Sequence, residues 1–320
     1  MHRVGVLTSG GDAPGMNAAV RAIVRKGIYY GLEVYGIKRG FHGLINGDFE
    51  KMELGSVADI IQRGGTRLLT ARCPEFVTRA GQEKAINKIK EYKLDGLIVI
   101  GGDGSFRGAM ALGDRGVVQT IGIPGSIDSD IAYTDVCIGF DTAMNTVTDA
   151  INKLRDTATS HERIFVVEVM GREAGFLALY AGLAGGAESI LVPEIDFDID
   201  EVCARIKKGH ERGKLHSIIL VAEGAASGIA IGEAIKKKTD MDTRITILGH
   251  LQRGGTPTAF DRIIASRMGS KALDLLRDGK SNLMVGLMGG EIKPTEFSTA
   301  LSQRKALDET IYDLARILAT

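Results

Sequence analysis

The feature of this sequence that most constrains its fold is an apolar segment that runs directly into a glycine-rich segment carrying one carboxylate. The apolar segment is 96–100 (GLIVI), and 101–105 (GGDGS) follows it. A continuous apolar run bounded by glycine is typical of a strand buried in a parallel sheet. We expect the glycines to take positive φ and to let backbone N–H groups approach a ligand, before a short helix over 107–113 whose N-terminus favours anions. Asp103 would then meet a cation that accompanies phosphate. The alternative is a tight turn that binds nothing.

The same arrangement occurs at the start of the chain. Residues 3–7 (RVGVL) have the composition of a buried strand, 8–17 (TSGGDAPGMN) form a second glycine-rich loop, and a helix is predicted to about Tyr30. Ligands of open α/β sheets bind outside the carboxyl ends of the strands, so both loops would face phosphate at one edge of the sheet. Neither loop is a P-loop, because no Gly-Lys-Ser/Thr follows. Neither has the Gly-x-Gly-x-x-Gly spacing of a dinucleotide fold.

Strand and helix patterns alternate along almost the whole chain, which predicts an α/β fold of mostly parallel sheet flanked by helices. The predicted strands are 3–7, 33–37, 96–100, 119–123, 164–168, 217–222, 243–247 and 283–287. Predicted helices include 80–92, 144–158, 200–212 and 259–278. No linker rich in Pro or Ser marks a domain boundary, and the loop-rich stretch 122–140 is the best candidate for one.

Composition excludes several classes of partner. Hydrophobic residues make up 44% of the chain and charged residues 25%, as in globular proteins. The formal net charge is +0, so nothing suggests binding to nucleic acid or to a membrane surface. We find no apolar run long enough for a membrane span and no signal-peptide pattern. The three cysteines, Cys73, Cys137 and Cys203, lack disulfide or zinc spacing, which favours a cytoplasmic location.

A dense polar cluster follows the predicted strand 119–123. The segment 124–130 (PGSIDSD) carries two carboxylates, Asp128 and Asp130, and two hydroxyls. One carboxylate could take a proton from a substrate while the other holds a metal ion or its water. The alternative is a solvated turn in which Asp and Ser bond their own backbone.

Arginines near the ends of predicted strands are candidates for binding phosphate, because the guanidinium group is a planar fork that matches phosphate oxygens. They are Arg163, Arg172, Arg244 and Arg253. His250 lies beside flexible glycine-rich backbone, and Glu223 ends a strand, where its carboxylate could accept hydroxyl protons of a sugar. Singly, each arginine also fits an ordinary surface position, and His250 fits a packed or capping histidine.

A second basic set lies elsewhere. Arg21 and Arg25 are four residues apart on a predicted helix and therefore share one face. Further candidates are Arg155, Arg212 and Lys214. From the residues alone, a solvated helix face is the simpler interpretation.

Taken together, these segments closely resemble the bacterial ATP-dependent 6-phosphofructokinases over essentially the whole chain. The motifs that carry the resemblance are 8–17, 63–66 (RGGT), 70–76 (TARCPEF), 101–105, 124–130, 139–143 (GFDTA), 155–163, 170–172 (MGR) and 249–255 (GHLQRGG).

The resemblance implies two α/β domains with the active site in the cleft between them. The ATP-binding domain would comprise 1–138 plus 252–304, and the fructose 6-phosphate domain 139–251 plus 305–320. It also implies a homotetramer in which each site is built across a subunit interface.

The reaction implied by the resemblance is ATP-dependent phosphorylation of fructose 6-phosphate at its 1-hydroxyl, with Mg²⁺ as cofactor. Asp128 matches the catalytic base, and Asp103 matches the carboxylate associated with magnesium. The residues that match groups around the transferring phosphate and ATP are Gly11, Arg72, Cys73, Gly102, Gly104, Ser105 and Ser126. The residues that match contacts to the sugar phosphate are Met170, Gly171, Arg172, Glu223, His250 and Arg253, with Arg163 and Arg244 reaching in from a neighbouring subunit.

The resemblance also implies an effector site for ADP or phosphoenolpyruvate. Its matching residues are Arg21, Arg25, Asp59, Arg155, Glu188, Arg212 and Lys214. Five cations with so few carboxylates repel one another unless an anion binds.

Three departures from the family pattern are visible. Ser126 and Ser129 stand where the family usually has threonine and asparagine, and Phe176 stands where a carboxylate is usual. The segment 131–133 (IAY) replaces one that often contains glycine. We expect the last two to affect substrate affinity and subunit communication more than the reaction.

Two alternatives remain. Pyrophosphate-dependent relatives typically carry Asp at the position of Gly104 and Lys at that of Gly125, whereas glycine leaves room for a nucleotide. A non-catalytic sugar-phosphate sensor would use the same site, although retention of Asp103 and Asp128 argues against it. Lipid and NAD kinases share the Gly-Gly-Asp-Gly segment, but nothing beyond it matches.

Overall fold

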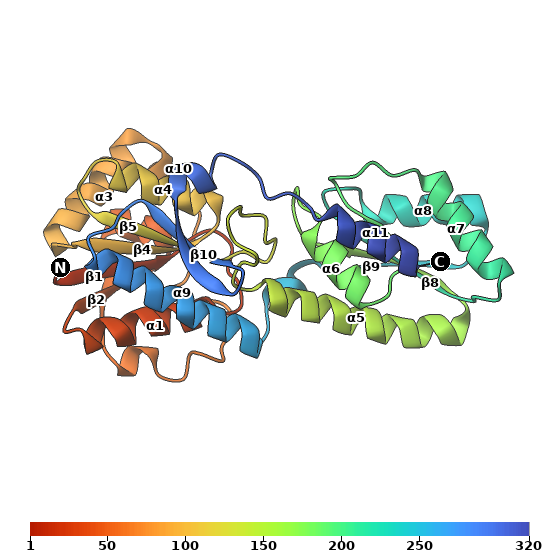
Figure 1. The fold of residues 1–320 in the computed structure, drawn as a ribbon, viewed down its shortest axis with the longest axis horizontal. Helices are drawn as coiled ribbons and strands as arrows, with labels where there is room; N and C mark the ends of the chain where they lie inside the picture. Colours follow the sequence, from red (N-terminus) through yellow and green to blue (C-terminus); the bar gives the residue numbers. More distant parts are fainter. Residues whose placement is uncertain (320) are drawn as a thin grey trace. The chain divides into compact units, whose positions relative to one another are not determined.

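The computed structural model describes residues 1–319 and shows two compact units. Unit 1 comprises Met1–Ser126, Ile131–Thr142 and Arg253–Lys305, and unit 2 comprises Ile127–Asp130, Ala143–Gln252 and the chain from Ala306. The segments 127–130 and 139–142, together with Gln252 and Lys305, therefore fall in the opposite units from the domains expected above. Thr320, the last residue of the expected second domain, lies outside the described residues. Both units are drawn in Figure 1.

Unit 1 is built on a seven-stranded sheet of order β11-β10-β5-β4-β1-β2-β3. The strands are β1 (Arg3–Thr8), β2 (Glu33–Ile37), β3 (Phe49–Met52), β4 (Gly96–Gly101), β5 (Gln119–Pro124), β10 (Leu283–Met288) and β11 (Glu291–Glu296). All pairings are parallel except those of the two edge strands, β3 and β11.

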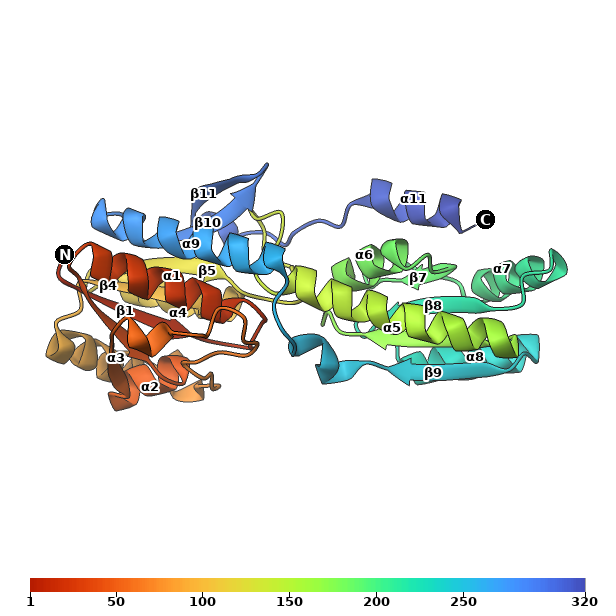
Figure 2. The same ribbon diagram turned by 90° about the horizontal axis from the view of Figure 1, so that it is seen from below.

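Helices cover both faces of this sheet. They are α1 (Met16–Tyr29), α2 (Gly40–Asn46), α3 (Arg79–Tyr92), α4 (Asp103–Gly113), α9 (Ala259–Arg277) and α10 (Phe297–Ala300). In both ribbon views α1 and α9 lie together on one face, and α3 and α4 lie on the other (Figures 1 and 2). Because side chains alternate across a strand, Leu97 and Val99 of β4 pack in the same core cluster as Phe106 of α4.

Unit 2 contains a four-stranded parallel sheet of order β7-β8-β6-β9. Its strands are β6 (Ile164–Val169), β7 (Ser189–Leu191), β8 (Ser217–Ala222) and β9 (Thr243–Ile247). Its helices are α5 (Phe140–His161), α6 (Phe176–Ala184), α7 (Ile199–Glu211), α8 (Gly228–Thr239) and α11 (Glu309–Leu318). Helix α5 begins in unit 1. Ile219 and Val221 of β8 pack with Ile206 of α7, whereas Leu220 points to α6, where a Cβ at Gly182 would lie 3.5 Å from it.

The prediction of mostly parallel α/β structure is confirmed, and all eight predicted strands are present. Three strands were missed. β3 and β11 carry charged, partly exposed residues, and β11 also contains Pro294. Both are edge strands, where proline and charge are tolerated, so their sequences lack the apolar strand pattern. β7 has only three residues.

The expected geometry of the 101–105 segment is wrong. Helix α4 begins at Asp103, not near 107, and Gly102 has φ −96°. Neither Gly101 nor Gly104 has positive φ. Gly101 is required for another reason, because a Cβ there would lie 2.5 Å from the carbonyl oxygen of Ser9. Positive φ occurs in the first glycine-rich loop instead, at Gly10 (84°) and Gly15 (109°).

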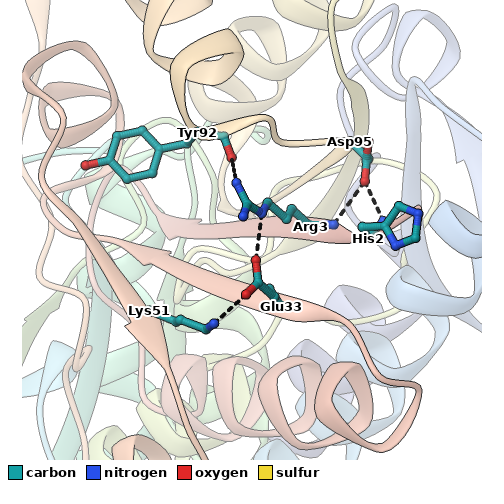
Figure 3. A network of polar contacts seen from close by, with 6 residues as sticks. All are labelled: His2, Arg3, Glu33, Lys51, Tyr92 and Asp95. Atoms are coloured by element: carbon teal, nitrogen blue, oxygen red, sulfur yellow. Dashed lines mark hydrogen bonds and ion pairs between the residues drawn. The ribbon is translucent and has the colours of Figure 1, made fainter.

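A polar network ties strands together at the amino edge of the unit 1 sheet, the edge opposite the glycine-rich loops. Figure 3 shows its residues, which are His2, Arg3, Glu33, Lys51, Tyr92 and Asp95. Arg3 Nε lies 2.6 Å from Glu33 Oε2, and the Arg3 N–H donates to Asp95 at 2.9 Å. Bonds from Lys51 and Arg3 lower the pKa of the Glu33 carboxyl. The network holds β1, β2 and β3 in register at this edge.

Among residues 1–319, no helix combines the length and the apolar character needed to cross a membrane.

Candidate active site

Two glycine-rich loops lie side by side at the carboxyl edge of the unit 1 sheet. β1 and β4 are parallel neighbours with Thr8 opposite Ile100, and the Ser9 N–H donates to the Ile100 carbonyl at 2.9 Å. The Thr70 hydroxyl donates to the Gly10 carbonyl at 2.7 Å, which brings the 70–76 segment to the same loops. The parallel sheet therefore brings two predicted ATP-site segments together, as expected for the carboxyl ends of adjacent strands, and Thr70 attaches a third to the first loop.

The N-terminus of α4 offers an open anion site. Asp103 lies in the first turn of the helix and is exposed, and Ser105 is buried behind it. A Cβ at Gly102 or Gly104 would meet no atom within 4 Å, so the space in front of these backbone groups is clear. The partial positive charge of a helix N-terminus favours phosphate.

The donor set fits magnesium that is bound together with phosphate. Within residues 1–319 no cluster of three or more His, Cys, Asp or Glu side chains could hold a metal ion. Mg²⁺ is commonly bound by one or two carboxylates together with the phosphates of a substrate. A single exposed carboxylate, Asp103, beside an open anion site matches that pattern.

Arg253, another predicted residue of unit 1, lies over the first loop. Arg253 Nη1 donates to the Asp12 carbonyl at 3.3 Å, and a Cβ at Gly11 would lie 2.5 Å from the same nitrogen. The guanidinium of Arg253 thus lies directly over Gly11, and a larger residue there would have to move it. Arg72 is exposed, and Cys73 is the N-cap residue of the short 3₁₀ helix Pro74–Val77.

In unit 2, a buried carboxylate faces an arginine. Asp128 is 3% exposed, and its Oδ2 lies 3.5 Å from Nε of Arg172, whose side chain is 63% exposed. Ser126, two residues earlier, follows β5 in unit 1 and donates its N–H to the Ile138 carbonyl. A carboxylate beside a guanidinium combines a proton acceptor with a group that can stabilise phosphate charge.

The backbone that presents Arg172 is strained. Gly171 has φ 150° and Arg172 has φ 53°, a left-handed conformation that is uncommon for a residue other than glycine. Glu223 Oε1 accepts the N–H groups of Gly171 (3.2 Å) and Arg172 (2.8 Å). Gly224 lets the chains approach closely, since a Cβ there would lie 1.9 Å from the Arg172 carbonyl oxygen. One oxygen of Glu223 is therefore already engaged by backbone.

Two of the predicted sugar-phosphate residues lie at the other edge of the unit 2 sheet. Arg163 precedes β6 and Arg244 is the second residue of β9, and both bond Asp242, at 2.7 and 3.1 Å. The bond from Arg163 is the main cause of the lowered pKa of the Asp242 carboxyl. A six-residue strand such as β6 spans about 20 Å. The structure therefore does not bring these arginines to the loop 170–172 of the same chain, although His250 and Glu223 follow strand ends on the loop side.

The predicted effector residues divide between the units. Arg21 and Arg25 on α1 and Asp59 belong to unit 1, and the rest belong to unit 2. Buried Glu188 pairs with Lys214 Nζ at 2.5 Å, and Arg155 Nη2 donates to the Gly186 carbonyl at 3.0 Å.

His216 is a nearby residue that the sequence reasoning missed. Burial lowers the pKa of its imidazole, and the Glu188 carboxylate opposes that shift. Its ring Nδ1 lies 3.5 Å from the Thr159 hydroxyl. Its place two residues after Lys214 is the only signal in the sequence that could have indicated it.

Comparison with known protein families identifies the family of this chain. The phosphofructokinase family model matches residues 3–276. This chain belongs to the phosphofructokinase family. The match confirms the resemblance inferred from the sequence motifs.

Curated relatives of this phosphofructokinase match it over the full chain. The ATP-dependent 6-phosphofructokinase of Halothermothrix orenii is 61% identical over 331 residues, covering 100% of both chains. The ATP-dependent 6-phosphofructokinase of Bacillus subtilis is 57% identical over 319 residues, again with 100% of both chains covered.

Solved structures of phosphofructokinases share the fold. That of Saccharomyces cerevisiae superposes with a TM-score of 0.89 at 33% identity, over 99% of this chain and 47% of that chain. This chain thus spans about half the length of the yeast subunit. The pyrophosphate-dependent phosphofructokinase of Marinobacter aquaeolei has a TM-score of 0.86 at 23% identity, over 97% of this chain and 86% of that one. The fold therefore also occurs in a pyrophosphate-dependent enzyme and does not identify the donor.

The departures from the phosphofructokinase pattern lie in structured positions. Phe176 is the first residue of α6 and is 3% exposed, so an apolar side chain suits its surroundings. Ser129 is buried with φ 51°, and Tyr133 has φ 59°. The segment 129–133 thus contains two non-glycine residues in the left-handed region, which restricts its backbone.

Proposed function

We propose that this chain is an ATP-dependent 6-phosphofructokinase, which phosphorylates fructose 6-phosphate at its 1-hydroxyl to give fructose 1,6-bisphosphate and ADP in glycolysis. The observation that carries the proposal is the buried carboxylate of Asp128 beside Arg172, in a chain that aligns over its full length with ATP-dependent relatives. The proposed location is the cytoplasm, where glycolysis takes place.

In the proposed mechanism, Asp128 accepts the proton of the 1-hydroxyl while that oxygen forms a bond to the γ-phosphorus of ATP. The bond from the γ-phosphorus to the oxygen bridging the β-phosphate breaks, and ADP leaves with the electron pair. Arg172 stabilises the charge that builds on the transferring group. Positioning and charge stabilisation account for most of the catalysis in phosphoryl transfer, and both residues provide them here.

Unit 1 is the proposed ATP-binding unit. The helix N-terminus at Gly102–Ser105 would bind the phosphates, and the 72–73 segment would contact the nucleotide. Gly11, Arg72 and Ser126 would hold the transferring phosphate. Asp103 would hold a Mg²⁺ ion, whose chemistry is to neutralise charge on the β- and γ-phosphates.

The choice of ATP over pyrophosphate is supported by the surroundings of two glycines. The space beside Gly104 is open, as a nucleotide requires. A Cβ at Gly125 would lie 2.9 Å from Met16 Cε, so the lysine typical of pyrophosphate-dependent enzymes would have to shift the end of the Met16 side chain.

The proposal predicts that fructose 1,6-bisphosphate forms with ATP much faster than with pyrophosphate. Rates with the two donors, at equal magnesium and saturating fructose 6-phosphate, measure this directly. The matched variant Gly104→Asp places a carboxylate in the nucleotide's space and should reduce the rate with ATP. Faster reaction of the wild-type protein with pyrophosphate would refute the donor assignment.

Unit 2 is the proposed fructose 6-phosphate unit. The residues proposed to contact the sugar phosphate within one chain are Met170, Gly171, Arg172, Glu223 and His250, with Arg253 from unit 1. Arg163 and Arg244 would serve the site of a neighbouring subunit in a homotetramer. Their position, about 20 Å along β6 from the loop 170–172, supports this assignment.

Replacing Arg163 or Arg244 by alanine should weaken fructose 6-phosphate binding and leave ATP binding nearly unchanged. A charged hydrogen bond to phosphate is worth about 1.5–3 kcal/mol, or roughly 10- to 150-fold in affinity. Titrations of both substrates measure the effect, with Arg316→Ala on α11 as the matched control. Mixing the Arg163→Ala protein with an Asp128 variant should generate some native-like sites, and failure of such hybrids to recover activity would contradict the shared site.

Phosphorylated effectors such as ADP or phosphoenolpyruvate are proposed to bind the predicted effector residues, which are Arg21, Arg25, Asp59, Arg155, Glu188, Arg212 and Lys214. The cationic groups of Arg155, Arg212 and Lys214 favour an anion. Because Phe176 and the segment 129–133 depart from the family pattern, we propose a modest allosteric response. Fructose 6-phosphate saturation curves with and without phosphoenolpyruvate measure it, and a shift of a hundredfold or more would contradict weak coupling.

A further inference from the structure

One buried polar side chain next to the proposed sugar-phosphate site has no role in the mechanism above. Gln252 is 0% exposed, although glutamine is usually found at protein surfaces. Its Oε1 accepts the N–H of Met170 at 3.2 Å, and its Nε2 donates to the Gly249 carbonyl at 2.9 Å. Both ends of the amide are therefore bonded to backbone, in agreement with the rule that buried polar groups are paired.

These two bonds join loops that follow neighbouring strands. β6 and β9 are parallel partners up to the pair Glu168 and Ile247. Beyond that pair, the segments that follow β6 and β9 share one further backbone bond, from the Leu248 N–H to the Glu168 carbonyl. Gln252 extends the connection past the sheet edge, from the 3₁₀ helix Gly249–Arg253 to the start of the loop 170–172.

Gln252 and Glu223 together bind three consecutive backbone N–H groups. Those of Gly171 and Arg172 donate to Glu223, and that of Met170 donates to Gln252. The left-handed backbone of Arg172 is unfavourable for a residue other than glycine and persists only when its surroundings fix it. The two side chains fix it from two different strand ends.

We propose that Gln252 is a positioning residue for phosphoryl transfer. It holds the loop 170–172 and the turn 249–253 in one arrangement, so that Arg172 stays beside Asp128 and His250 stays on the same side of the sheet. The inference rests on the proposed function for its kinetic consequence. Its structural part, that Gln252 restrains the backbone of 170–172, stands independently of any substrate.

The variant Gln252→Met tests the proposal, because methionine fills a similar volume but can neither accept from Met170 nor donate to Gly249. Misplacement of a binding group by about 1 Å can cost up to about 100-fold. We expect the KM for fructose 6-phosphate to rise and turnover to fall, together lowering kcat/KM by about 10- to 100-fold, with the KM for ATP within twofold of wild type. The control is Gln303→Met at an exposed position in unit 1.

Gln252→Glu is the second variant. Its protonated carboxyl can still accept from Met170 and donate to Gly249, whereas the ionised form would oppose the Gly249 carbonyl. Burial raises the pKa of such a carboxyl. Relative to wild type, the activity of this variant should therefore recover as the pH is lowered from 8 to 6. A side chain that contributes only packing volume predicts no such recovery and no separation of the two KM values.

Hydrogen exchange of the peptide covering 168–175 completes the experiment without using activity. Exchange should be faster in Gln252→Met than in wild type and unchanged in Gln303→Met. Equal exchange in all three proteins, or equal changes in both KM values, overturns the proposal. If the wild-type protein makes no fructose 1,6-bisphosphate but the exchange difference appears, the proposed function fails and the restraint by Gln252 stands.

Discussion

Replacing Asp128 by asparagine is expected to lower turnover by about 10²–10⁴-fold, the usual contribution of a general base, with much smaller changes in the KM for either substrate. The amide has nearly the shape of the carboxylate, so it can occupy the same buried position beside Arg172. It cannot take up the proton of the attacking hydroxyl. Loss of charge beside the exposed guanidinium of Arg172 should also loosen the position of that group.

Steady-state rates over a range of both substrates measure the effect and separate turnover from binding. Asp149→Asn is the matched control, since Asp149 is an exposed carboxylate on α5 that pairs with Lys153 four residues along the helix. It should behave like the wild-type protein. Near-full turnover in Asp128→Asn would show that another group accepts the proton.

The second large effect is expected on stability, at Asp261. This carboxylate is 0% exposed and accepts the N–H of Gly139 at 2.8 Å, together with the N–H (2.8 Å) and the hydroxyl (2.5 Å) of Thr142. It thereby links α9 to the first turn of α5. Asparagine offers only one acceptor oxygen, and its NH₂ group would face a donor. Asp261→Asn should therefore lower the free energy of unfolding by about 1–3 kcal/mol for each donor left unpaired.

The stability of the wild-type protein should also depend on pH through this group. Burial raises the pKa of Asp261 to about 6 from 3.8, against the opposing bonds from Thr142 and Gly139. The folded state therefore binds the proton more tightly than the unfolded state. The resulting stabilisation is fully present below pH 3.8 and is lost as the pH rises through 6. The pKa of Asp261 differs between the folded and unfolded states by about 2.2 units, which corresponds to about 3 kcal/mol of folding free energy.

Denaturant unfolding of wild type and Asp261→Asn at pH 4.5 and pH 7.5 measures both effects. The asparagine variant cannot titrate at this position, so its deficit relative to wild type should be larger at pH 4.5. Asp278→Asn, at the exposed C-terminal end of the same helix, is the control. A deficit that is the same at both pH values would contradict the raised pKa.

Local sequence patterns predicted most of the fold because most strands of this protein are buried on both faces. Such strands must be apolar along their length, as at 96–100 and 217–222, and the pattern is readable without knowledge of any partner. The edge strands β3 and β11 escaped prediction because exposure removes that requirement. The start of α4 was placed too late because glycine at 102 and 104 suggested a turn, whereas these residues lie at a helix N-terminus and leave its approach open.

The sequence by itself determined the α/β class, the positions of the glycine-rich loops and the types of residue available for phosphate chemistry, because each depends on residues close together in the chain. Tertiary structure alone decided the pairing of Asp128 with Arg172, the engagement of Glu223 by backbone N–H groups and the burial of Gln252. The residues that interact follow the ends of different strands and lie 44 to 82 positions apart in the sequence. The largest separation is that of Gln252 and Met170, whose N–H donates to Gln252 Oε1. No local pattern encodes such a contact, because it depends on which strand ends the tertiary structure brings together.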